Sequence, residues 1–130
     1  MDELDLLLKA ATTSAQCRTV CSRAYYVSFR LLIGVCWPVG FDPDHIDRTA
    51  ERRMSVHRRL FEFLRQSDVV ALRNVGRTRI ERLFDLRIKA DYRFRLPVTS
   101  AEAQDAVHLA RDIHDWIADA GLPSQFSQRP

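Results

Sequence analysis

The spacing of the apolar residues is the feature that most restricts how this chain can fold, because it is helical along the whole length. In the clearest example, Tyr25, Phe29, Leu32 and Cys36 follow one another at i, i+4, i+7 and i+11. That spacing places the four side chains on one face of a single helix. No segment shows a convincing strand pattern, so the sequence predicts an all-α protein.

Capping residues and a proline divide this pattern into four main helices, which follow a short helical segment. Ser14 is placed to cap the first long helix, and Pro38 ends it. Thr99 and Glu102 have the spacing of a capping box for the last helix, which Gly121 ends. The predicted helical spans are 3–11, 15–36, 50–66, 77–92 and 99–120.

These spans predict an up-down bundle of four main helices plus the N-terminal helical segment. Ser67 is expected to cap only a short turn that ends near Asn74. A chain of 130 residues fits a single domain. We expect that domain to cover residues 1–122, with residues 123–130 as a frayed tail.

Several classes of protein are not expected from this sequence. No apolar run approaches the roughly 20 residues that a membrane span needs, and the N-terminus lacks a signal pattern, so we expect a cytoplasmic protein. Cys17, Cys21 and Cys36 are expected to be buried, reduced thiols, because no further ligands stand at zinc-site spacing. Neither a metal nor a cofactor is expected.

The basic residues are concentrated in the middle of the chain. Residues 48–95 hold fourteen basic and six acidic groups, whereas the segments on both sides are net acidic. Eighteen of the twenty basic residues are arginine, whose planar fork matches phosphate and carboxylate oxygens two at a time. The segment is therefore either an anion-binding surface or a solvated helical face with many ion pairs. The candidate nucleic-acid or anion-binding residues, two of them on the preceding helix, are Arg23, Arg30, Arg52, Arg53, Arg58, Lys89 and Arg93.

The segment LFDLRIKADYRFR, residues 83–95, places charged groups beside an apolar helical face. Arg87 and Asp91 are four residues apart, so they lie on the same side of the helix. Either they form an ordinary surface ion pair, or they lie at the edge of a functional site. Asp91 is also a candidate partner for Arg23, which precedes two tyrosines on the first long helix.

Three fragments of the chain resemble segments of small proteins of the HEPN superfamily, in the same order and at similar spacing. They are SRAYYVSFR at residues 22–30, SVHRRLFEF at 55–63 and LRIKADY at 86–92. The similarity covers about residues 17–120. It implies a HEPN-like helical bundle that commonly forms a homodimer.

The resemblance also implies a choice between two kinds of function. Many HEPN proteins are metal-independent ribonucleases that act as toxins or antiviral effectors, often encoded beside a nucleotidyltransferase antitoxin. Others are binding or scaffolding modules without nuclease activity. We therefore expect either an RNA- or nucleotide-associated protein of a prokaryotic toxin–antitoxin or phage-defence module, or a non-catalytic adaptor that binds a protein partner.

The resemblance suggests which residues would form a nuclease site. HEPN ribonucleases use an arginine and a histidine that are separated by four to six residues, which would make Arg87 the group that holds the phosphate. Residues 88–96 contain no histidine, which leaves Tyr92 or His57 to move the proton. The candidate catalytic residues are Arg87, Asp91, Tyr92 and His57.

His57 admits two interpretations. It completes an Arg-x4-His pattern with Arg52, but five residues along a helix separate two side chains by about 140°. The alternative is that His57 caps or packs near the start of a helix. A dimer could also bring His57 of one chain towards Arg87 of the other. Whether the protein is an enzyme is left open by the sequence.

Overall fold

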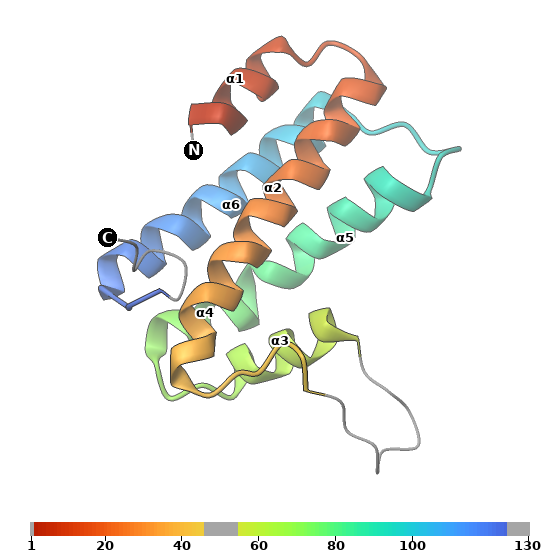
Figure 1. The fold of residues 1–130 in the computed structure, drawn as a ribbon. Coiled ribbons are helices and arrows are strands. Elements are labelled where there is room, and N and C mark those ends of the chain that lie inside the picture. The colour runs from red at the N-terminus through yellow and green to blue at the C-terminus, as the bar shows by residue number, and fades with distance from the viewer. Residues whose placement is uncertain (1, 46–54, 125–130) are drawn as a thin grey trace.

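The computed structural model describes residues 2–45 and 55–124, and all regular secondary structure in these ranges is helical (Figure 1). The prediction of an all-α protein is therefore confirmed. The described residues form six α-helices and one 3-10 turn: α1 (Asp2–Ala10), α2 (Ser14–Cys36), η1 (Trp37–Val39), α3 (Val56–Arg65), α4 (Val70–Thr78), α5 (Ile80–Tyr92) and α6 (Ser100–Ala120).

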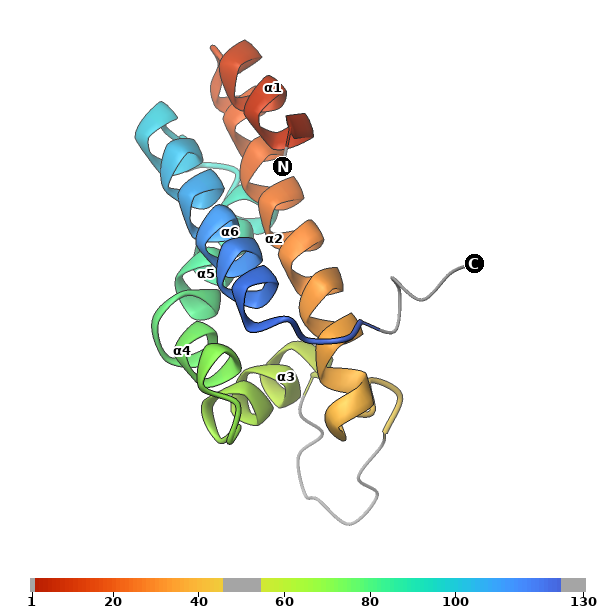
Figure 2. The same cartoon turned by 90° about the vertical axis from the view of Figure 1, so that its left-hand side faces the viewer.

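Three long helices form the body of the molecule. The central helix α2 packs against both α5 and α6, and α1 lies alongside α2 and α6 near the start of α2 (Figures 1 and 2). The shorter helices α3 and α4 pack on each other across the opposite end of the body (Figure 1). After α6 the chain turns back towards the second half of α2, where Ser124 is buried (Figure 2).

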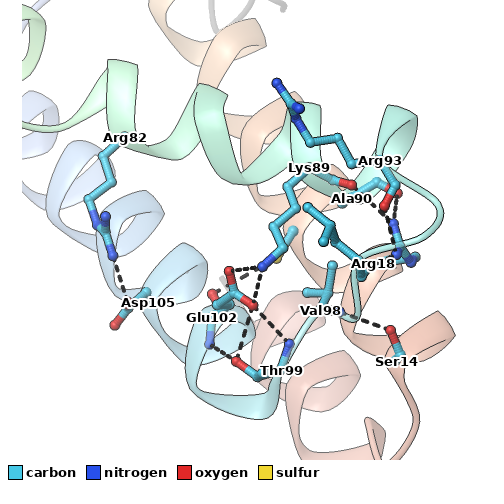
Figure 3. A network of polar contacts seen from close by, with 12 residues as sticks. Ser14, Arg18, Arg82, Lys89, Ala90, Arg93, Val98, Thr99, Glu102 and Asp105 are labelled. Atoms are coloured by element: carbon cyan, nitrogen blue, oxygen red, sulfur yellow. Dashed lines mark hydrogen bonds and ion pairs between the residues drawn. The ribbon is translucent and has the colours of Figure 1, made fainter.

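The start of α2 differs by one residue from the prediction. Thr13 is the N-cap: its hydroxyl accepts a hydrogen bond from the Gln16 amide at 3.2 Å, and the Gln16 side chain accepts one from the Thr13 amide at 3.1 Å. The prediction that Ser14 caps the helix is wrong, because Thr13 has the extended backbone that an N-cap requires. Ser14 instead accepts a hydrogen bond from the Val98 amide at 2.9 Å, which ties α2 to the loop before α6 (Figure 3).

The predicted signals of the last helix are confirmed. The Thr99 hydroxyl accepts from the Glu102 amide at 3.1 Å, and the Glu102 carboxylate accepts from the Thr99 amide at 3.1 Å. At the other end Gly121 has a φ of 64°, the left-handed conformation in which glycine ends a helix without strain.

The region between α3 and α5 differs most from the prediction. Where a short turn was expected after Ser67, the chain forms the nine-residue helix α4. The Ser67 hydroxyl accepts from the Val69 amide at 3.1 Å, just before that helix begins. Arg79, with a φ of −128°, interrupts the helical run, so α5 begins at Ile80 rather than at residue 77. Ser55 caps α3, and the predicted start of that helix, at residues 50–54, lies outside the described residues.

A glycine allows α3 and α4 to pack closely. A Cβ atom placed on Gly76 would lie 2.7 Å from both the Arg65 backbone nitrogen and Leu64 Cβ. Both distances are shorter than carbon can approach without moving one of the helices. Gly76 is therefore required by the packing rather than by a turn.

The core contains all three cysteines. Cys17, Cys21 and Cys36 lie on α2, and all are buried and free of disulfide bonds, as predicted. Burial raises the pKa of the Cys21 and Cys36 thiols to about 12. None of the described helices combines the length with the apolar character that a membrane span needs.

Candidate functional site

Four rings from three helices form an aromatic cluster: Tyr25 and Phe29 of α2, His57 of α3, and Phe84 of α5. Tyr25 and Phe29 are one helical turn apart and stack with their centroids 5.7 Å apart. The His57 ring lies 4.6 Å from the Phe29 centroid and 5.3 Å from that of Phe84. His57 is thus held between α2 and α5, although it is the second residue of α3.

His57 is hydrogen-bonded to Tyr25, with 2.6 Å between Nδ1 and the phenol oxygen. Burial lowers the pKa of His57, and the nearby positive charge of Arg87 lowers it further. Burial raises the pKa of Tyr25. At neutral pH the pair therefore consists of an uncharged imidazole and a protonated phenol.

The direction of this hydrogen bond decides what His57 can do. If the phenol donates to Nδ1, the imidazole carries its proton on Nε2 and that nitrogen is a donor. If Nδ1–H donates to the phenol oxygen, Nε2 has a free lone pair and can accept a proton from a substrate. General-base chemistry at His57 requires the second arrangement.

Arg87 is held by an ion pair and by two aromatic rings. Its Nε is 2.9 Å from Asp91 Oδ2, and its guanidinium carbon lies 5.7 Å from the Tyr25 centroid and 5.5 Å from that of Tyr92. Asp91 also accepts a hydrogen bond from the Ser22 hydroxyl of α2. About a quarter of the Arg87 side chain, 24%, is exposed. Asp91 and the two rings therefore orient the guanidinium while part of it stays open to solvent.

The structure brings together the four residues that the sequence predicts as catalytic. His57 and Arg87 both lie against Tyr25, and Asp91 and Tyr92 both contact Arg87. A second chain is not needed to bring His57 near Arg87. We call Tyr25, His57, Arg87, Asp91 and Tyr92 the Arg87 cluster.

Most candidate anion-binding residues lie elsewhere. Lys89 Nζ donates to both carboxylate oxygens of Glu102 on α6, at 2.8 and 3.0 Å (Figure 3). Arg93 takes part in the network of Figure 3 through its carbonyl oxygen, which accepts from Arg18 at 3.1 Å. Arg58 lies 3.6 Å from Glu81. These groups do not surround one shared cleft.

The remaining candidates are on α2 or outside the described residues. Arg23 pairs with Glu3 of α1 at 3.1 Å, rather than with Asp91. Arg30 is an exposed residue of α2 that lines a pocket apart from the Arg87 cluster. Arg52 and Arg53 belong to residues 46–54, which the structure does not describe.

Two residues that contact the predicted catalytic residues were not among the predicted site residues. Tyr25 is buried in the core, and its hydroxyl is also hydrogen-bonded to His57. Ser22 donates a hydrogen bond to Asp91 across the contact between α2 and α5. Both stand in the SRAYY fragment, which was the available signal.

Comparison with protein-family models, with curated proteins and with solved structures gave no match to this chain. Within the described ranges, no three histidine, cysteine or acidic side chains are grouped as metal ligands would be. A function for this chain therefore has to be inferred from the geometry of the Arg87 cluster.

The low pKa of His57 can be tested directly. In an NMR titration of its ring protons, we expect the midpoint below the ordinary value of about 6.5. Arg87→Gln should raise the midpoint, because it removes one of the two causes of the shift. Arg82→Gln, on the same helix but paired with Asp105 of α6, should leave it unchanged. An unchanged midpoint in Arg87→Gln would show that the two groups do not interact.

The lowered pKa of His57 also affects stability. The folded state disfavours protonated His57. The contribution of this residue to the free energy of unfolding is therefore complete above about pH 6.5, the pKa in the unfolded state, and it is lost as pH falls through the lower pKa of the folded state. The slope of unfolding free energy against pH can reach about 1.4 kcal/mol per pH unit for one such group.

Proposed function

We propose that this protein is a HEPN-type RNA- or nucleotide-associated protein of a prokaryotic toxin–antitoxin or phage-defence module, and that the Arg87 cluster binds a phosphate group. One observation carries the proposal: a partly exposed arginine and an uncharged histidine lie against the same tyrosine ring. Every residue of the cluster also stands in one of the three fragments that resemble HEPN proteins.

The orientation of Arg87 suits a phosphate. The ion pair with Asp91 is formed through Nε at 2.9 Å, and we expect the terminal amino groups to contact the phosphate oxygens. The carboxylate offsets part of the positive charge, so we expect moderate affinity with a clear dependence on salt. The ring of Tyr92, which is 61% exposed, lies beside the guanidinium and offers a surface for a base.

A ribonuclease reaction would use the two ends of the cluster differently. His57 would accept the proton of the 2′-hydroxyl through Nε2 as that oxygen attacks phosphorus, while Arg87 would stabilise the charge that develops on the phosphorane oxygens. The bond from phosphorus to the 5′-oxygen would then break, and the imidazolium or water would protonate the leaving oxygen. Tyr25 would select the required tautomer by accepting from Nδ1–H. Protonation of His57 at acidic pH would abolish this step.

The test is RNA binding and cleavage with matched arginine variants. Arg87→Gln should weaken binding of a labelled single-stranded RNA about tenfold and reduce the salt slope by about one. Arg82→Gln should change neither by a comparable amount. Cleavage that disappears in His57→Gln would identify a ribonuclease. Binding that is equal in Arg87→Gln and the native protein would contradict the proposal.

A second candidate function, the non-catalytic adaptor, rests on a different observation. The end of α5 and the loop that follows it expose three large apolar side chains, Tyr92 at 61%, Phe94 at 77% and Leu96 at 48%. Exposed apolar groups that are contiguous often mark a protein interface. A partner protein, such as a nucleotidyltransferase antitoxin or a second copy of this chain in a cytoplasmic homodimer, would cover them. Loss of that partner in Phe94→Ser, with RNA binding unchanged, would favour the adaptor.

A further inference from the structure

A pocket of about 650 Å³ lies between the second half of α2 and the C-terminal end of α6. Val27, Leu31 and Val35 of α2 line one wall, and Ile117 of α6 and Leu122 line the other. Helix α1 packs beside the first half of α2, and the chain after α6 turns back towards α2 at the other end (Figure 2). The pocket is therefore the stretch of the groove along α2 and α6 that neither α1 nor the chain after α6 covers.

The α2 wall of the pocket carries two arginines. Arg23 and Arg30 are seven residues apart, so they lie two turns apart on the same face of the helix. The Arg23 guanidinium lies 5.5 Å from the ring centroid of Tyr26, which also lines the pocket, and its Nε pairs with Glu3. Positive charge thus stands beside apolar side chains along one edge of the pocket.

The α6 wall carries a histidine that the fold does not satisfy. His114 lines the pocket, and its Nε2 is enclosed without a hydrogen-bond partner among the described residues. Burial lowers the pKa of His114, so its ring is uncharged at neutral pH. The charge that a ligand meets in this pocket therefore comes from the α2 side.

We infer that this pocket binds a small carboxylate with an apolar chain, the chain between α2 and α6 and the carboxylate at Arg23 and Arg30. The volume is within the range of about 300–1,000 Å³ that is usual for small-molecule pockets. A guanidinium matches the two oxygens of a carboxylate, and the five aliphatic residues on the walls match an alkyl chain. No residue of the Arg87 cluster lines this pocket, so the inference does not rest on the proposed function.

The test uses decanoate, below the concentration at which it forms micelles, and the methyl NMR signals of the full chain. We expect decanoate to shift the signals of Val27, Leu31 and Ile117 and to raise the melting temperature. Decanol has the same chain without the charge, and butyrate has the same charge with a short chain. Both should bind at least about tenfold more weakly.

Two pairs of variants locate the site. Ala118→Trp places a large ring in the pocket from an exposed position on α6 and should abolish binding. Ala101→Trp, also at an exposed position on α6 but outside the pocket, should leave it unchanged. Arg30→Gln should weaken decanoate about tenfold, whereas Arg77→Gln on α4 should have no effect.

Three results would overturn the inference: methyl signals of the pocket that decanoate leaves unshifted, decanol that binds as tightly as decanoate, or Ala118→Trp that binds as the native protein does. Shifts of the same methyl signals with protein concentration alone, without a response to decanoate, would assign the groove to a second copy of the chain instead.

Discussion

Replacing Gly76 with alanine is expected to lower the free energy of unfolding by about 3 kcal/mol, since the added carbon forces α3 and α4 apart. The new atom would meet the Arg65 backbone nitrogen and Leu64 Cβ at 2.7 Å, and the Leu64 carbonyl carbon at 2.9 Å. Two of these three atoms belong to the backbone, so a side-chain rotation cannot relieve the contact. The higher helix propensity of alanine, worth up to about 1 kcal/mol, offsets only part of the loss.

Urea unfolding followed by circular dichroism measures this effect, and Gly121→Ala is the matched control. Gly121 has a φ of 64°, but a Cβ atom placed on it would meet nothing within 4 Å, so the control isolates backbone strain from packing. Its expected cost is about 1 kcal/mol. Should Gly76→Ala prove no more destabilising than Gly121→Ala, the close approach of α3 and α4 would be disproved.

Removing the Arg18 side chain is expected to cost about 2 kcal/mol and to loosen the end of α5. The last carbonyl groups of a helix lack hydrogen-bond donors within the helix, and for α5 the Arg18 side chain of α2 provides donors. The Arg18 guanidinium donates to the carbonyl oxygens of Lys89 at 3.0 Å, Ala90 at 2.9 Å and Arg93 at 3.1 Å, and also to that of Leu96 (Figure 3). Loss of these bonds frees the turn of α5 that carries Asp91 and Tyr92.

Arg18→Ala and Arg18→Lys should therefore be compared by urea unfolding and by amide hydrogen exchange. Lysine keeps the charge but lacks the planar fork, so we expect it to recover less than about half of the loss. Faster exchange should be confined to the amides of the last turn of α5 and the following loop. Arg77→Ala, at an exposed position on α4, should cost no more than about 0.5 kcal/mol. Unchanged exchange near residues 89–96 in Arg18→Ala would contradict this role.

The sequence alone predicted correctly those helix ends that depend on neighbouring residues. The capping box at Thr99 and Glu102, and the helix end at Gly121, depend on residues within one turn, and both were predicted correctly. Helix α4 was not predicted because it contains Asn74 and Gly76, and both residue types have low helix propensity. The need for glycine at position 76 comes from α3, and such a contact between separate helices does not appear in a local pattern.

The site was predicted in part for the same reason. The spacing of Arg87 and Asp91 is a property of one helix, so the sequence alone places them on the same side, and the structure contains their ion pair. The partners of the other basic residues were not predictable, because they lie on a different helix. Residues 48–95 are strongly basic and residues 96–130 are net acidic, and the pairs of Arg79, Arg82 and Lys89 with α6 show that these segments neutralise each other.

The three thiols inside α2 have a practical consequence for following the motions of the molecule. A thiol reagent attacks the thiolate, and the folded protein presents neither accessible sulfur nor, at Cys21 and Cys36, an ionisable one at neutral pH. Alkylation of these residues must wait until the central helix separates from its neighbours. The rate at which a thiol reagent labels the native protein therefore measures how often α2 separates from its neighbours, and no cysteine has to be introduced for the experiment.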